Sequence, residues 1–480
     1  MREKTIRIVV AGIGGYGKMY LHHLLAPLPP ALAGAVQLVG VADPAPQRCE
    51  HYPRLVEVEV PIYPSLERFY ETERADLAVI ATPVQLHAAH IELALSHGSH
   101  VLCEKPLASS LADVRRLLRA RDRAARNVSL GYQWSYCPAV RELKRDVAAG
   151  LLGKPLRMRT LILWPRGDQY YARNRWAGRL RDDNGLLVLD SPLHNACAHF
   201  VHNAFYVLGN ATELRAWPTR VTAELYRAHP TIENYDTAAV RCKIGEDVEA
   251  LFLASHAVPQ RRGPDFVYEF ERAVVTYEDD LSPGPAPHLH KLNGHAIHNG
   301  NGNGNGNGNG HANGNGHHDE GNRGAIVARF NDGTVKRYGK PATSDDPTKL
   351  WHAVEAIREG RSPICGIEAT AAQTALVTAA QESMPELQLF DRATLREDLT
   401  QTGQTFWVPE LAEQLTDCFR TMRLPSESGL PWARAGKPIS IAPFNSALEV
   451  TISQVARPVG ADRPHGPSSA RLTAPRAGRA

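Results

Sequence analysis

A glycine motif near the N-terminus has the spacing of a dinucleotide-binding turn. The motif Gly12-Ile13-Gly14-Gly15-Tyr16-Gly17 follows an apolar run at residues 6–11 and opens a helical pattern at 16–25. In a strand–turn–helix unit, the first glycine permits a tight turn, the second admits a pyrophosphate, and the third lets the helix pack against the strand. The free N–H groups at the helix start can then hold the phosphates. All six motif residues are therefore predicted to bind a dinucleotide.

A carboxylate follows the second apolar run. Asp43 stands at the end of residues 36–42, 26 residues after Gly17. A carboxylate at this place can accept hydrogen bonds from a ribose 2′-OH and would repel a 2′-phosphate. NAD is therefore the predicted cofactor. Two alternatives stay open: Arg48 nearby leaves NADP possible, and Asp43 could simply open a turn before Pro44.

Two further apolar runs end in polar residues. Residues 77–81 lead into Thr82-Pro83, and residues 100–103 lead into Glu104-Lys105-Pro106. Open parallel sheets bind their ligands beyond the carboxyl ends of the strands, where both motifs would lie. The predicted cofactor contacts in this region are Thr82, Pro83, His87, Glu104, Lys105 and Gln133.

The main catalytic candidates of the second half lie between residues 190 and 199. Removing a hydride from a carbinol carbon requires a base for the hydroxyl proton, and histidine suits this role near neutral pH. The segment offers two registers with four-residue spacing, Asp190 with His194 and Asn195 with His199. Since proline favours the first helical turn, Pro192 predicts that a helix begins there and that Asp190 precedes it.

Residues 164–179 are rich in aromatic and arginine side chains and form the predicted substrate contact. Aromatic faces, guanidinium groups and amides suit a polyhydroxylated or carboxylated ligand. The candidates are Arg173, Asn174 and Trp176. The same composition also suits a subunit interface, which is the alternative reading.

The apolar runs predict the elements that position these residues. In the first half, strands are expected at 6–11, 36–42, 77–81, 100–103 and 127–130, with helices at 16–25, 85–97 and 110–124. Such alternation predicts a parallel sheet covered on both faces. In the second half, strands are expected at 156–163, 236–242, 248–255, 267–277, 325–330 and 334–338, and helices at 137–149, 351–357 and 369–383. The last helix is Ala-rich and is expected to pack against the sheet.

Two segments lack the apolar groups that a core requires. Residues 299–316 are a nearly pure Asn-Gly repeat, within an insertion at about 282–322 that is predicted to be disordered. Histidines flank the repeat, but this composition offers no fixed ligand geometry, so no metal site is predicted. The C-terminal extension, residues 426–480, is predicted to be disordered after about 456.

The order of these motifs, from the glycine turn through Asp43, Thr82-Pro83 and Glu104-Lys105-Pro106 to Gly131-Tyr132-Gln133, resembles the Gfo/Idh/MocA oxidoreductases. That family includes glucose–fructose oxidoreductase and inositol dehydrogenase. The resemblance implies a Rossmann domain (1–133) and an α+β domain (134–425) with a large, mostly antiparallel open sheet. It also implies that Lys105 contacts both nicotinamide and substrate, and that the open sheet face forms a homodimer or homotetramer.

The resemblance favours one of the two histidine registers. In the family, the catalytic histidine lies about ten residues before the end of its helix, as His199 does before Leu208-Gly209. His199 is therefore the preferred base, with Asn195 replacing the family's aspartate. Asp190 and His194 are expected to line the site. Because asparagine carries no negative charge, it would orient His199 or the substrate without raising the pKa of the base.

Composition argues against several other classes. The 480 residues carry a formal net charge of +3, with 54 basic and 51 acidic residues, so neither nucleic acid nor a membrane is an expected partner. An apolar signal or spanning segment is not recognised. Seven scattered cysteines without CxxC pairs fit reduced thiols in the cytoplasm and argue against a zinc site.

The predicted function is that of a cytoplasmic NAD(P)-dependent oxidoreductase. The substrate would be a small polyol or sugar-like compound, such as a sugar, a cyclitol or a related hydroxy compound, oxidised at a CH–OH group. Two alternatives stay open. One is a nucleotide-binding sensor that keeps the fold without turnover, and the other is glycoside cleavage through transient oxidation by bound NAD.

Overall fold

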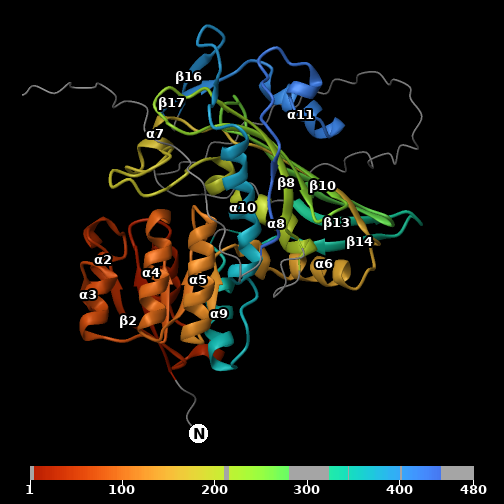
Figure 1. Cartoon of the computed structure of the whole chain (residues 1–480). Coiled ribbons are helices and arrows are strands. Elements are labelled where there is room, and N and C mark those ends of the chain that lie inside the picture. The colour runs from red at the N-terminus through yellow and green to blue at the C-terminus, as the bar shows by residue number, and fades with distance from the viewer. Residues whose placement is uncertain (1–4, 210–215, 280–323, 344, 401–402, 445–480) are drawn as a thin grey trace, which may run out of the picture. The chain divides into compact units, whose positions relative to one another are not determined.

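The computed structural model describes residues 5–209, 216–279, 324–343, 345–400 and 403–444 (Figure 1). The Asn-Gly repeat and the tail after residue 456 lie outside these residues. The described residues cluster into one compact unit. No helix in the described ranges is both long and apolar enough to cross a membrane.

The first half forms a six-stranded parallel sheet in the order β3-β2-β1-β4-β5-β6. Its strands are β1 (Ile6–Ala11), β2 (Val36–Ala42), β3 (Ile62–Tyr63), β4 (Leu77–Ile80), β5 (His100–Cys103) and β6 (Val128–Leu130). Its helices are α1 (Gly17–Leu25), α2 (Tyr52–Glu57), α3 (Leu66–Thr72), α4 (Val84–Ser96) and α5 (Leu111–Ala124). The five predicted strands and three predicted helices are confirmed, with ends shifted by at most one residue. The sequence did not predict β3, α2 and α3.

The two faces of this sheet are buried by different helices, because successive strand residues point to opposite sides. Val9 of β1 belongs to the cluster that contains the buried residues of α4 and α5. Val10 belongs to a second cluster with residues of α1 and of α9 (Thr348–Arg358). The contribution of α9 is Leu350, Ala353 and Val354. A helix from far along the chain therefore completes the cover of the nucleotide-binding sheet.

The second half contains the large, mostly antiparallel sheet that was predicted, in the order β14-β13-β12-β11-β7-β10-β9-β8-β15, with β18 beside β8. Among the described strands of this second sheet, β7 pairs with β10 and β8 with β15 in parallel, and the other neighbours pair antiparallel. The strands are β7 (Pro155–Leu163), β8 (Pro218–Arg227), β9 (Thr237–Ile244), β10 (Val248–Ser255), β11 (Arg262–Phe270), β12 (Ala273–Asp279), β13 (Gly324–Phe330), β14 (Val335–Gly339), β15 (Gln388–Leu389) and β18 (Ile439–Ser440). A separate hairpin consists of β16 (Arg396–Thr400) and β17 (Gly403–Trp407).

One strand prediction in this half is wrong. The single strand expected at 267–277 is instead parts of β11 and β12, which pair as an antiparallel hairpin. The turn between them is Glu271-Arg272, and it contains neither glycine nor proline to mark it in the sequence. The long strand β8 was not predicted.

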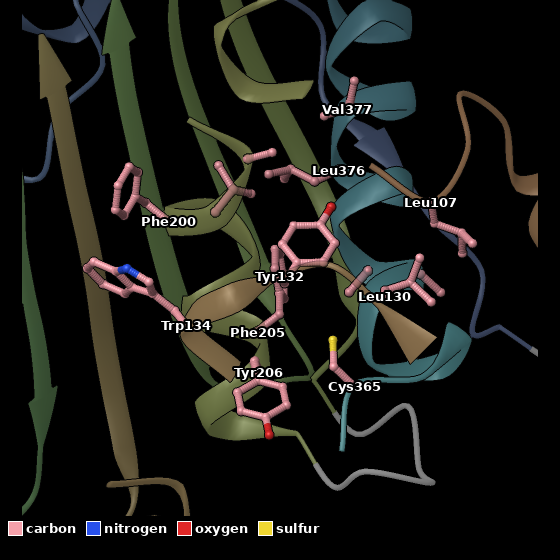
Figure 2. Packing of buried hydrophobic residues seen from close by; sticks show 14 of the residues in the cluster. Leu107, Leu130, Tyr132, Trp134, Phe200, Phe205, Tyr206, Cys365, Leu376 and Val377 are labelled. Carbon is pink, nitrogen blue, oxygen red and sulfur yellow. The ribbon is translucent and has the colours of Figure 1, made fainter. Parts of the chain in front are cut away.

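One face of the large sheet packs against α6 (Pro138–Ala148), α8 (Ala198–Leu208) and α10 (Ile367–Ser383). Figure 2 shows this core, in which Phe200 and Phe205 of α8 lie near Trp134 and Tyr132, while Leu376 and Val377 come from α10. As predicted, the Ala-rich α10 packs against β8. Small side chains allow this close approach of helix and strand.

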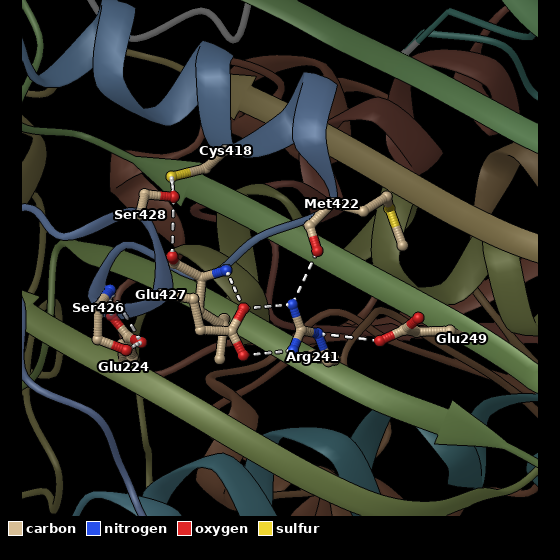
Figure 3. Close-up of polar contacts among 9 residues, drawn as sticks. Glu224, Arg241, Glu249, Cys418, Met422, Ser426, Glu427 and Ser428 are labelled. Atoms are coloured by element: carbon tan, nitrogen blue, oxygen red, sulfur yellow. Dashed lines mark hydrogen bonds and ion pairs between the residues drawn. The ribbon is translucent and has the colours of Figure 1, made fainter. Parts of the chain in front are cut away.

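The opposite face of the sheet is covered by α11 (Leu411–Thr421), which the sequence did not predict. Leu411, Leu415 and Cys418 of this helix share a core cluster with Leu251 and Leu253 of β10. The segment after the helix is fixed by polar contacts, drawn in Figure 3.

Two acidic side chains make these contacts. Arg241 of β9 donates to both carboxylate oxygens of Glu427, each at 2.6 Å, and to the carbonyl of Met422 at 2.7 Å. Glu224 of β8 accepts a hydrogen bond from the hydroxyl of Ser426, and burial raises the pKa of its carboxyl. The side chains of β8 and β9 thereby hold the segment that follows α11 against the sheet.

Candidate functional site

The glycine turn has the space that a pyrophosphate requires. Gly12 has φ +82°, and a side chain there would lie 2.7 Å from the carbonyl oxygen of Ala81. A side chain at Gly17 would overlap the carbonyl oxygen of Gly12. At Gly14, only a carboxylate oxygen of Asp43 lies within 4 Å, at 3.9 Å, and at Gly15 nothing does. The turn is tight where helix and strand meet and open at its tip, so it fits the diphosphate of a dinucleotide.

Asp43 is part of the turn's own framework. Its Oδ2 accepts hydrogen bonds from the amides of Ile13 at 2.8 Å and Gly14 at 3.2 Å, and its Oδ1 accepts from Ala45 at 2.8 Å. Asp43 therefore lies at the end of β2 beside the glycine turn, as predicted. The sequence did not reveal the contacts that the carboxylate makes to the turn. Arg48, the residue that kept NADP open, is exposed in a short turn (Pro46–Arg48).

His87 links the ends of β4 and β5. Its Nδ1 lies 2.7 Å from the carbonyl oxygen of Pro106, and its Nε2 lies 2.8 Å from that of Thr82. The ring is buried, and burial lowers its pKa. His87 was predicted as a cofactor contact, but both of its ring nitrogens are used to join the two motif turns. Gln133 is buried in a short turn (Gln133–Tyr136) directly after β6.

Glu104 forms a buried ion pair that sequence reasoning missed. Its Oε1 accepts from Lys349 Nζ at 2.5 Å and from the Tyr20 hydroxyl at 2.6 Å. Lys349 lies on α9, is only 2% exposed, and also donates to the Tyr16 hydroxyl at 3.1 Å. Burial alone would raise the pKa of Glu104, but Lys349, Tyr20 and Lys105 together outweigh burial and the pKa is lowered. Burial alone would lower the pKa of Lys349, but Glu104 and Tyr16 together outweigh burial and the pKa is raised.

The sequence does contain a signal for this pair. Lys349 falls on the apolar stripe of its helix, beside Leu350, Ala353 and Val354. A lysine on a buried helix face requires an anionic partner. Gly131 adds a second constraint, because a side chain there would lie 2.7 Å from Glu104 Oε1.

Lys105 connects the two halves of the chain. Its Nζ donates to the backbone oxygen of Asn195 at 2.8 Å and to Asn195 Oδ1 at 3.0 Å. Asn195 Nδ2 in turn donates to Asp190 Oδ1 at 2.7 Å. Burial lowers the pKa of Lys105 to about 8, although the charges of Glu104 and Asp190 oppose this shift. The contacts thus draw one member from each predicted register, Asp190 and Asn195, into a single network with Lys105.

The helix that carries these residues is interrupted. A π-helical turn begins at Pro192 and ends at Ala196, and α8 begins at Ala198. The predicted start at Pro192 is confirmed, with Asp190 preceding it. The expected continuous helix is wrong, because the break at Cys197 separates Asn195 from His199.

The two candidate histidines differ in their surroundings. His194 is buried, its Nε2 lies 3.3 Å from the Ser109 hydroxyl, and burial lowers its pKa to about 3. Such a histidine is a weak base at neutral pH. His199 is partly exposed and meets the ring of Tyr132 edge-on at 5.7 Å. Tyr132 follows the end of β6, so His199 lies near the carboxyl ends of the parallel strands.

The predicted substrate residues fall into two groups. The guanidinium of Arg173 lies 3.8 Å from the Tyr170 ring, 5.3 Å from the Trp176 ring and 3.6 Å from Asp190 Oδ2. Asn174 instead accepts from the amides of Trp176 at 3.0 Å and Ala177 at 2.8 Å. These contacts make Asn174 a turn-forming residue just after α7 (Asp168–Ala172), while Arg173 joins the Lys105–Asn195–Asp190 network.

Comparisons with known proteins match the N-terminal domain to an oxidoreductase family. Residues 6–132 match the family described as "Oxidoreductase family, NAD-binding Rossmann fold". The N-terminal domain belongs to the Gfo/Idh/MocA family. This assignment agrees with the open glycine turn and with the 3-2-1-4-5-6 strand order.

Two curated relatives extend the likeness unequally. Inositol 2-dehydrogenase 4 of Saccharopolyspora erythraea is 32% identical over 160 residues, which is 33% of this chain and 45% of that protein. The chain thus matches less than half the length of that relative. D-apiose dehydrogenase of Paraburkholderia graminis is 25% identical over 297 residues, covering 61% of this chain and 71% of that protein.

Among solved structures, the WlbA dehydrogenase of Bordetella pertussis, in complex with NADH and UDP-GlcNAcA, superimposes with a TM-score of 0.57 at 17% identity. The match covers 80% of this chain and 97% of that structure. At this identity the likeness concerns the fold, and it includes the second half of the chain as well as the Rossmann sheet.

Proposed function

We propose that this chain is an NAD(P)-dependent oxidoreductase that transfers a hydride between nicotinamide and a CH–OH group of a sugar, cyclitol or related hydroxy compound. The observation that carries the proposal is the position of Lys105. Lys105 lies two residues after the end of β5, at the edge of the sheet that also holds the glycine turn. Its ammonium group donates hydrogen bonds to Asn195, which belongs to the C-terminal part of the chain. The names of the relatives, an inositol dehydrogenase and an apiose dehydrogenase, support the same substrate class.

In the proposed reaction, bound NAD supplies the hydride acceptor. Lys105, with a pKa of about 8, is mostly protonated at neutral pH and donates a hydrogen bond to the substrate oxygen as it becomes a carbonyl. Asn195 and Asp190 hold the ammonium group from the other side. His199 accepts the hydroxyl proton, and its partial exposure gives that proton a route to solvent.

NAD rather than NADP is the proposed cofactor. Asp43 stands at the end of β2 with its carboxylate at the glycine turn, and a 2′-phosphate at this place would meet its negative charge. Gly14 and Gly15 would admit the pyrophosphate, and the first amides of α1 would donate to it.

We further propose a cytoplasmic enzyme that forms a homodimer or homotetramer through the large sheet. All seven cysteines are free and buried, which a reducing compartment maintains. Since α11 covers part of one sheet face, self-association would use the strands beside it. Those strands, β11 to β13, carry Glu269, which pairs with Arg157 at the start of β7, and the ion pair Arg329–Glu278. Light scattering of the purified protein would give its oligomeric state.

A screen of sugars and cyclitols with NAD, following the absorbance of NADH, tests the activity. Accumulation of NADH supports a dehydrogenase. Release of a glycosidic leaving group without net NADH would instead support the hydrolase, and NAD binding without any turnover would support the sensor. Lys105→Met serves as the matched inactive control for every substrate that reacts.

A further inference from the structure

We infer that the substrate carries an anionic group, a carboxylate or a phosphate, and that Arg166 and Arg173 bind it. This inference rests on the proposed function and specifies its substrate class. Both arginines belong to the segment that joins β7 to the π-helical turn at Pro192.

The two arginines belong to a stack in which guanidinium groups and aromatic rings alternate. Arg173 lies 3.8 Å from the centre of the Tyr170 ring, and Arg166 lies 4.8 Å from the same ring. Arg166 also lies 5.8 Å from the Trp164 ring, which Arg261 approaches to 4.3 Å. At the other end, Trp176 lies 5.3 Å from Arg173. The full order is Trp176, Arg173, Tyr170, Arg166, Trp164 and Arg261.

Stacking leaves the hydrogen-bonding edges of these guanidinium groups available. An aromatic ring contacts the flat face of a guanidinium, whereas all five N–H groups point outward in its plane. Arg166 Nε is a buried atom that has no hydrogen-bond partner among the described residues. Arg173 Nη1 donates to the Tyr170 carbonyl, and its buried Nη2 has no hydrogen bond among the same residues and only the ion pair with Asp190 at 3.6 Å. A bidentate acceptor such as a carboxylate or a phosphate would satisfy donors of this geometry.

The local charge is also unbalanced. Arg166 forms no ion pair with any residue in the described ranges, and Arg173 has only Asp190, at 3.6 Å. Asp190 already accepts from Asn195 at 2.7 Å and from the Gly178 amide at 2.6 Å. Asp190 thus serves Arg173, and Arg166 has no carboxylate partner in the described ranges. Guanidinium groups held near the same ring repel each other, and an anion that contacts the edges of both would relieve that repulsion.

The network fixes where this anion would lie on the substrate. Arg173 contacts Asp190, Asp190 contacts Asn195, and Asn195 contacts Lys105, which faces the reacting oxygen in the proposed mechanism. From Arg173 the stack continues through Tyr170, Arg166 and Trp164 to the exposed Arg261. The charged group of the substrate would therefore meet Arg173 and Arg166, while the reacting oxygen meets Lys105.

Calorimetric titration of the NADH complex with three matched hexoses tests this inference. The probes are D-glucose, D-glucuronate and D-glucose 6-phosphate, which share a ring and differ in the group at one end. We expect the two charged sugars to bind at least about tenfold more tightly than D-glucose, and Arg166→Gln to remove about that factor, the scale of one charge-assisted hydrogen bond. The two charged arms show whether carboxylate or phosphate is preferred.

Arg420→Gln is the charge-matched control, since Arg420 is 69% exposed and its one ion pair among the described residues is with Asp417 on its own helix. It should change neither sugar affinity nor NADH affinity. Equal binding of all three sugars, no binding of any of them, or equal losses in the two variants would overturn the inference. A wild-type chain that fails to bind NADH would overturn the proposed function instead. Titrations without NADH would then still decide whether the anion site exists.

Discussion

Lys105 and Asn195 are 90 residues apart in the sequence, yet the lysine ammonium donates to both oxygens of the asparagine, at 2.8 and 3.0 Å. One residue follows a strand of the Rossmann sheet, and the other lies in a π-helical turn of the second half. The position of the ammonium group therefore depends on both halves. The neutral asparagine links Lys105 to Asp190, because its side-chain oxygen accepts from Lys105 and its nitrogen donates to Asp190. It adds no charge of its own to the site.

Lys105→Met should lower kcat by at least about 100-fold, the scale of losing a well-placed polar or proton-transfer group. Methionine keeps the length of the side chain, so the melting temperature and NADH affinity should change little. Because the pKa of Lys105 is about 8 and the protonated form is needed, wild-type kcat/KM for oxidation should fall as the pH rises through about 8. A fully active Lys105→Met enzyme would refute the mechanism.

Asn195→Asp should move that alkaline limb to higher pH. A carboxylate 3.0 Å from the ammonium group favours its protonated form and typically shifts a pKa by about 1 to 3 units. The same substitution places a second carboxylate against Asp190, 2.7 Å away, so some loss of stability is also expected. The pH profile of kcat/KM measures the shift. An unchanged midpoint would show that Lys105 does not set this limb.

His199→Ala and His194→Ala should differ in their kinetic effects. Loss of His199, the proposed base, should reduce kcat by at least about 100-fold. Loss of His194, a buried histidine with a pKa of about 3, should act mainly on KM and on stability. Steady-state kinetics of both variants decide the matter. An inactive His194→Ala enzyme beside an active His199→Ala enzyme would reverse the assignment.

Lys349→Met should lower the free energy of unfolding by about 3 to 5 kcal/mol, because it leaves the buried carboxylate of Glu104 without its partner. Adding Glu104→Gln to this variant should restore part of the loss. Lys18→Met is the control, since Lys18 pairs with an exposed Glu50 at 3.3 Å and such surface pairs contribute about 0 to 1 kcal/mol. Denaturant titrations give all four values. Equal losses from Lys349→Met and Lys18→Met would contradict this account of the pair.

We expect the wild type to bind NAD more tightly than NADP, because the carboxylate of Asp43 would lie at the 2′ position. Asp43→Ser should make the two affinities more similar. The variant should also weaken NAD itself, since Asp43 holds the amides of Ile13 and Gly14. Fluorescence titration with both reduced cofactors measures the two effects. A wild type that binds NADPH more tightly than NADH would show that Asp43 does not face the 2′ position.

The parts of the site that the sequence predicted are those fixed by local patterns. The glycine turn, Asp43 and Lys105 each follow an apolar strand directly, and parallel strands bring their carboxyl ends to one edge. The order of the strands therefore places these residues together without knowledge of any long-range contact.

The parts that were missed depend on contacts between distant segments. Lys349 reaches Glu104 across 245 residues, and the side chain of Asn195 turns its oxygen to Lys105 and its nitrogen to Asp190. The hairpin of β11 and β12 was missed for a different reason. Its turn, Glu271-Arg272, contains no residue that marks a turn, so residues 267–277 read as one continuous strand. Side-chain partners of this kind require the tertiary structure.

The cover that α11 provides has a consequence for the biosynthesis of the chain. The strands that it covers, β7 to β10, are complete once residue 255 has left the ribosome, but α11 begins only at Leu411. At about 5 to 20 residues per second, that interval lasts on the order of ten seconds. During this time Leu161, Leu163, Leu251 and Leu253 face water on one side of a nascent sheet. This apolar face of the nascent sheet is therefore open to aggregation, and to chaperone binding, until α11 has emerged.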